Sequence, residues 1–160
     1  MNCVVIQSDE DPLPSWSKKA ERFTLTLLER LQKEDWEVSI LFCSDEYIRS
    51  LNFQFRKKDE ATDVLSFFLG ETIEENGGKK YLPGDIVISL ETLYKNSQYF
   101  NVSPDEELRR LLIHGILHLS GMDHEGSIDN KDRALNADIE PMLQLQEELL
   151  ADLVGERILP

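Results

Sequence analysis

The sequence predicts a single α/β domain, with about four strands in a mixed sheet and helices packed around it. Three observations lead to this expectation. The 160 residues suit one domain that spans positions 1–160. Hydrophobic residues make up 41% of the chain, as in globular proteins. Segments rich in β-branched and aromatic residues alternate with segments whose apolar residues recur every three or four positions, which predicts strands alternating with helices.

The N-terminal part predicts a strand, a helix and a second strand. Residues 2–7 are apolar enough for a short buried strand. Apolar residues at helical spacing follow from residue 15 to about 33, and residues 36–42 then alternate between apolar and polar side chains. This order predicts a right-handed βαβ unit.

The middle of the chain predicts two further strands separated by a loop. Ser44 opens a short helix, and residues 64–69 have the β-branched and aromatic content of a strand. Residues 70–83 contain three glycines and a proline, so we expect a mobile hairpin-type loop there. The fourth strand covers residues 84–89, and its last residue caps another short helix.

The clearest helix start in the chain lies at Ser103. This residue is the predicted N-cap, Pro104 takes the first helical position and Glu106 completes a capping box. The apolar side chains that follow make this helix central, and Gly121 is placed to end it in a left-handed conformation. A last helix is expected over residues 138–154.

The chain is strongly acidic, with 17 basic and 31 acidic residues and a formal net charge of −14. This balance argues against a protein that binds nucleic acid mainly by neutralising phosphates over its whole surface. Any polyanionic substrate would need a local basic patch, a metal ion or a docking partner. The basic residues that could form such a patch are clustered at Arg56-Lys57-Lys58, Lys79-Lys80 and Arg109-Arg110.

We expect a cytoplasmic protein that does not enter a membrane. No apolar run approaches the roughly 18 residues that a membrane-spanning helix needs, and the N-terminus lacks the pattern of a signal peptide. The two cysteines, Cys3 and Cys43, fall in predicted strands. Reduced, buried thiols are the favoured interpretation, and a disulfide between neighbouring strands is the alternative.

All three histidines of the chain lie in one segment, His114-Gly115-Ile116-Leu117-His118-Leu119-Ser120-Gly121-Met122-Asp123-His124. His114 and His118 are four residues apart on the predicted helix, so their imidazoles project from one face. The turn at Gly121 allows His124 to return to the same point. Single helical histidines are usually ordinary polar residues, but three in this arrangement predict a metal site. Three nitrogen ligands leave one position open for water, as in catalytic metal sites.

The spacing also matches the zinc-protease pattern HExxHxxGxxH, with one exception. The glutamate that serves as general base in that pattern is replaced here by Gly115. The residues therefore indicate a metal site without the base that a protease needs.

The histidine segment resembles the signature of the YbeY family of bacterial endoribonucleases and ribosomal RNA maturation factors. The resemblance extends over residues 36–155, and the other stretches that carry it are Leu51-Asn52 with Arg56, Ala61-Thr62-Asp63-Val64-Leu65-Ser66-Phe67 and Gly84-Asp85-Ile86-Val87-Ile88-Ser89.

This resemblance implies a single-strand-specific, metal-dependent endoribonuclease that acts in 16S rRNA 3′-end maturation and ribosome quality control. It implies that His114, His118 and His124 bind one divalent ion, most often zinc, although nickel is also compatible with three histidines. His114 and Arg56 are the implied catalytic residues. Ribosomal RNA and components of the small ribosomal subunit are the implied partners.

Several points stay open from the residues alone. Arg56 could form an ordinary surface salt bridge, since Asp59 lies close to it in the chain. The general base is not identified, because Asp123, Asp85 and Asp63 each have a structural interpretation. Two other functions remain as alternatives: a different metallohydrolase, or a ribosome-assembly factor in which the metal only joins helices. No oligomeric state is predicted.

Overall fold

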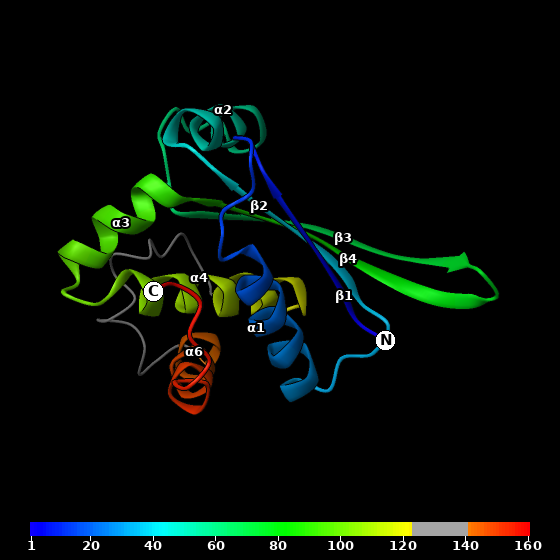
Figure 1. Ribbon diagram of the computed structural model, residues 1–160. Coiled ribbons are helices and arrows are strands. Elements are labelled where there is room, and N and C mark those ends of the chain that lie inside the picture. The colour runs from blue at the N-terminus through cyan, green and yellow to red at the C-terminus, as the bar shows by residue number, and fades with distance from the viewer. Residues whose placement is uncertain (123–140) are drawn as a thin grey trace.

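A four-stranded mixed sheet lies at the centre of the structure, which is a computed structural model that describes residues 1–122 and 141–160. The predicted α/β class is confirmed (Figure 1). In chain order the described elements are β1 (Cys3–Ser8), α1 (Ser17–Arg30), β2 (Glu37–Cys43), α2 (Asp45–Arg56), β3 (Val64–Glu75), β4 (Gly78–Ser89), α3 (Leu90–Tyr99), α4 (Pro104–Leu119) and α6 (Pro141–Asp152).

The strands are arranged in the order β1-β2-β4-β3. Strands β1 and β2 are parallel and are joined through α1, which confirms the predicted βαβ unit. Strand β4 is parallel to β2, and β3 pairs with β4 as an antiparallel edge strand. Helix α2 covers one face of the sheet, whereas α1, α4 and α6 lie on the other side (Figure 1).

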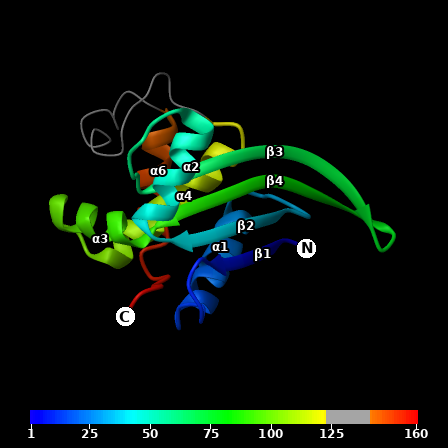
Figure 2. The same cartoon turned by 90° about the horizontal axis from the view of Figure 1, so that it is seen from above.

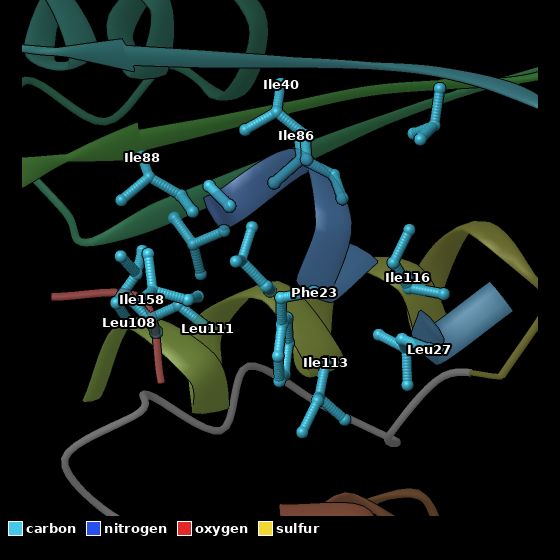
Figure 3. Close-up of a cluster of buried hydrophobic side chains, with 14 of the residues drawn as sticks. Phe23, Leu27, Ile40, Ile86, Ile88, Leu108, Leu111, Ile113, Ile116 and Ile158 are labelled. Carbon is cyan, nitrogen blue, oxygen red and sulfur yellow. The ribbon is translucent and has the colours of Figure 1, made fainter. Parts of the chain in front are cut away.

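The sheet is buried on both faces because its strands alternate between two apolar clusters. In β2, the side chains of Val38, Ile40 and Phe42 belong to the main core, which also contains the apolar sides of α1 and α4. Figure 3 shows Phe23 and Leu27 of α1 in this cluster. The other face carries a smaller cluster beneath α2, made of Cys43, Ile48, Leu65 and Val87.

The hairpin predicted at residues 70–83 is confirmed, but the loop is wrong, because strands β3 and β4 extend through this segment almost to the turn. The ladder between β3 and β4 continues from Glu71↔Leu82 to Glu75↔Gly78. Asn76 and Gly77 both have positive φ, at 52° and 79°, as a tight Asn-Gly hairpin turn requires. The hairpin extends beyond the other strands in both views (Figures 1 and 2), and its mostly exposed residues lack the apolar alternation that usually marks a strand.

Helix α4 begins as the sequence predicts. The side chain of Ser103 accepts a hydrogen bond from the backbone N–H of Glu106 at 3.0 Å, and Pro104 follows it. Gly121 comes directly after the C-cap with φ of 96°, which confirms the predicted left-handed end. The helix runs along the sheet and contacts α1, α3 and α6, so its central place in the fold is also confirmed.

The C-terminal segment is held against the start of α4 by Asp105. Its Oδ1 accepts the backbone N–H groups of Ile158 and Leu159 at 2.7 and 2.8 Å, and its Oδ2 accepts from Arg109 Nε at 2.9 Å. Arg109 also donates to the carbonyl of Leu153. Of the predicted helix over residues 138–154, the structure describes α6, whereas residues 138–140 lie outside the described ranges.

Both cysteines are free thiols, so the alternative of a disulfide is excluded. They lie near opposite ends of β2, since Cys3 pairs with Glu37 and Cys43 is the last residue of that strand. Burial is the main cause that raises the pKa of the Cys43 thiol to about 12. Within the described residues, no helix is both long and apolar enough to span a membrane.

Candidate metal centre

His114 and His118 lie one turn apart on the same side of α4. Their ring centroids are 4.8 Å apart and the ring planes make an angle of 71°. Two imidazoles that each place a nitrogen about 2.0–2.1 Å from one tetrahedral ion would have their centroids about 5 Å apart. The pair therefore has a spacing that fits two ligands of a single divalent ion.

The packing of α4 on the sheet determines which way the histidine pair faces. A Cβ added to Gly115 would lie 2.8 Å from Ile86 Cδ1, so this position is in close contact with β4. The histidine side of the helix is turned toward α6, because His114 Nδ1 lies 2.7 Å from Oε1 of Gln146. His114 is buried and His118 is half-buried.

The position of Gly115 also bears on the protease pattern. In that pattern the residue after the first histidine carries the general base. Here a Cβ would press against the side chain of Ile86, so this position of α4 packs closely on β4. The absence of a glutamate thus coincides with a close contact between α4 and β4.

The third predicted ligand, His124, and its neighbour Asp123 lie outside the described residues. In the remaining 1–122 and 141–160, no group of three or more His, Cys, Asp or Glu side chains is arranged to hold a metal ion. The structure therefore brings together His114 and His118, and the complete three-histidine site stays a prediction.

Arg56 is the last residue of α2, and its side chain is exposed. Helix α2 lies on the face of the sheet opposite α4 (Figure 1). Within the described ranges, no bond joins Arg56 to His114 or His118. The predicted alternative, a salt bridge with Asp59, is not formed. Asp59 instead accepts two hydrogen bonds from Arg49, at 2.8 and 3.2 Å. Among the described residues Arg56 has no ion-pair partner, and its catalytic role stays a prediction.

The three basic clusters differ in their availability for a polyanion. Arg109 and Arg110 are buried, and each pairs with carboxylates, so the expectation that they could form a surface patch is wrong. Lys80 is shared between Glu37 and Glu75. By contrast, the segment Arg56-Lys57-Lys58 is fully on the surface.

The candidate general bases are distributed over different environments. Asp63 is buried directly before β3 and accepts a hydrogen bond from Asn96 at 3.0 Å. Asp85 is exposed on β4. The general base is not assigned from this geometry.

Sequence reasoning missed Gln146 and Glu147, which the structure places next to the histidine pair. Gln146 contacts His114 although 32 positions separate them. Both residues look like ordinary polar positions of an amphipathic helix, so the sequence carried no signal for this contact.

The fold and the site together define a class of protein. It is an α/β domain with a mixed sheet, whose central helix α4 carries two histidines four residues apart as candidate metal ligands. The model of the family described as endoribonuclease YbeY matches residues 5–154, and the chain therefore belongs to this family.

Individual relatives agree with this assignment. The chain is 44% identical over 144 residues to the endoribonuclease YbeY of Treponema denticola, which covers 89% of this chain and 87% of the relative. It is 44% identical over 130 residues to the endoribonuclease YbeY of Borreliella afzelii, with 80% of each chain covered. The solution structure of a Thermotoga maritima protein superposes with a TM-score of 0.60 at 30% identity, over 96% of this chain and 90% of that one.

Proposed function

We propose that this protein is a metal-dependent, single-strand-specific endoribonuclease that acts in 16S rRNA 3′-end maturation and in ribosome quality control. The observation that carries the proposal is the pair His114 and His118, set 4.8 Å apart on α4. The protein belongs to a family whose curated relatives are named endoribonucleases, which supports an RNA substrate.

The proposed ligands of one zinc ion are His114, His118 and His124. Neutral imidazoles are ordinary zinc ligands, and three of them leave a position for water or substrate. When bound, the ion would supply a Lewis acid that polarises a phosphate oxygen or activates water. The protein contributes the direction of the rings, which α4 fixes for two of them.

Arg56 is proposed to bind the phosphate under attack. In hydrolysis the oxygen of water bonds to phosphorus, the bond from phosphorus to the leaving ribose oxygen breaks, and that oxygen takes up a proton. Negative charge grows on the non-bridging oxygens, which a guanidinium can bind with two parallel hydrogen bonds. Arg56 is exposed and is not engaged by Asp59, so its donors remain available for a phosphate.

The C-terminal end of α2 offers a surface suited to single-stranded RNA. Arg56, Lys57 and Lys58 are exposed in succession, and the nearby rings of Phe53 and Phe55 are 56% and 59% exposed. Surfaces that bind single strands combine positive charge with aromatic rings on which bases stack. Because the whole protein carries −14, free RNA should bind weakly, and the small ribosomal subunit and its rRNA are the proposed partners.

The alternative of a metal that merely joins helices has less support. Helices α4 and α6 are already connected without it, through the bidentate pair of Arg110 with Glu147 and the contact of His114 with Gln146. Removal of the metal ion by a chelator should therefore leave the protein folded but abolish its cleavage activity.

The test combines metal analysis with an RNA cleavage assay on the purified full-length protein. We expect one divalent ion per chain, and cleavage of a single-stranded RNA but not of the same sequence in a duplex. The His114→Ala variant should lose both the ion and the cleavage. A wild-type protein that cuts single-stranded RNA equally well after complete removal of metal would contradict the proposal.

A further inference from the structure

A chain of hydrogen bonds runs from Arg110 through the half-exposed Glu147 and the buried Gln146 to His114. Arg110 holds the carboxylate of Glu147 with two parallel bonds, Nε to Oε2 at 2.9 Å and Nη2 to Oε1 at 3.0 Å. Gln146 Nε2 donates to Glu147 Oε2 at 3.1 Å, and Gln146 Oε1 lies 2.7 Å from His114 Nδ1. Gln146 is 1% exposed, His114 6% and Arg110 8%, whereas the side chain of Glu147 is 40% exposed. Water is therefore kept mainly from the bond between Gln146 and His114, which is buried.

This chain determines which nitrogen of His114 carries the proton. A carboxylate fixed by an arginine only accepts hydrogen bonds, so the amide of Gln146 must turn its NH₂ group toward Glu147. Its carbonyl oxygen then faces His114, and that oxygen also only accepts. His114 Nδ1 must therefore donate, which leaves the lone pair of the neutral ring on Nε2.

The same contacts disfavour the reversed arrangement. Turning the amide of Gln146 over would place its oxygen against the carboxylate of Glu147, 3.1 Å away, where two acceptors would face each other. The amide of Gln146 itself is buried, so few other donors are available to its oxygen there. The orientation of the amide is thus set by Arg110 and Glu147.

We propose that Gln146 is a positioning residue that holds His114 in the Nδ1–H tautomer with Nε2 directed as a metal ligand, and that the Arg110–Glu147 pair keeps the Gln146 amide in the required orientation. The inference rests on the proposed function, since that function makes His114 a ligand. Partners of this kind fix the tautomer and ring direction of ligating histidines, and their loss lowers metal affinity by about 10–100-fold.

A matched pair of variants separates positioning from simple packing. Gln146→Met removes the amide but keeps a side chain of similar length and helix propensity. Gln144→Met makes the same substitution two residues earlier on α6, at an exposed position. A purely structural role of Gln146 would change stability without moving the proton on His114.

The first measurement uses the metal-free full-length protein labelled with ¹⁵N-histidine. Long-range ¹H–¹⁵N NMR at about pH 8, above the ordinary histidine pKa of about 6.5, reports the tautomer of each neutral ring. The signals of His114 are those lost in His114→Ala. We expect the Nδ1–H tautomer in the wild type and in Gln144→Met, and a mixture of tautomers in Gln146→Met. A wild-type His114 that carries its proton on Nε2 overturns the inference without any variant having to fold.

The second measurement is a zinc titration against a chromophoric chelator. Gln146→Met should bind zinc about 10–100-fold more weakly than the wild type, and Gln144→Met should be unchanged. Equal zinc affinity and an equal tautomer in both variants would overturn the positioning role. If the wild type bound no metal, the proposed function would fail, while the tautomer measurement would still decide whether Gln146 orients His114.

Discussion

Two basic clusters that look alike in the sequence occupy opposite environments in the structure. Arg109 and Arg110 are buried in α4, where carboxylates of the same helix and Glu147 of α6 surround them. Arg56, Lys57 and Lys58 stand exposed at the end of α2. One cluster joins α4 to α6 through Arg110 and Glu147, whereas the side chains of the other are exposed. A count of basic residues therefore says little about a binding surface until their partners are known.

The difference arises from the acidic residues within reach of each cluster. The first turn of α4 carries Asp105, Glu106 and Glu107, and an arginine three or four residues later lies beside them on the helix. At the end of α2 the nearby acid, Asp59, is bound by Arg49. Because Arg109 and Arg110 are buried, each needs a carboxylate partner. A buried charge without one would lose its hydration with no compensating interaction, which would destabilise the fold.

The largest effect is expected for Arg110→Met. This change leaves the fully buried Glu107 and the carboxylate of Glu147 without the guanidinium that both contact. Breaking a buried pair by removing one partner costs about 3–5 kcal/mol. Denaturant unfolding monitored by circular dichroism should show this loss, whereas Lys57→Met should stay within about 0.5 kcal/mol of the wild type. Equal stability of the two variants would remove the distinction between the clusters.

A second prediction concerns activity, for which the exposed cluster rather than the buried one is expected to matter. Arg56→Ala should leave stability and metal content unchanged, because the side chain is exposed and without an ion pair in the described part of the chain. Cleavage of single-stranded RNA should fall about 10²–10³-fold, the usual effect of removing one group that stabilises transition-state charge. A single-turnover assay checks this, with Arg49→Ala as the neighbouring arginine control. Cleavage at the wild-type rate would show that Arg56 does not act on the phosphate.

The elements that the sequence predicted well are those with strong local signals. Ser103 and Pro104 fixed the start of α4, and the alternation of Val38, Ile40 and Phe42 identified the buried face of β2. The histidine spacing predicted that His114 and His118 share one face, which the ring separation confirms. Each of these features depends on residues close in the chain.

What the sequence could not predict depends on contacts between distant residues. The outer hairpin has few apolar side chains, so Asn76-Gly77 marked a turn without revealing the strands on either side. Arg110 is bound by Glu147, and His114 Nδ1 contacts Gln146, both from another helix. No periodic pattern or motif in the sequence indicates either contact.

The smallest expected effect concerns the salt dependence of RNA binding. The double variant Lys57→Gln with Lys58→Gln removes two exposed charges at the end of α2. Each phosphate contact contributes about 0.7 to the slope of log affinity against log salt for single strands, so two lost contacts lower it by about 1.4. Fluorescence anisotropy with a labelled single strand, in a His114→Ala background that does not cut it, measures the slope.

The chain supplies a matched control in Lys18 and Lys19, a second pair of adjacent, exposed lysines at the start of α1. Changing this pair to glutamine alters the net charge by the same amount but leaves the end of α2 intact. If RNA contacts the α2 end, only the Lys57 and Lys58 variant should flatten the slope. An identical change in both variants would mean that RNA senses the overall charge of −14 rather than this surface. In that case the specificity for RNA would have to come from the ribosomal partner alone.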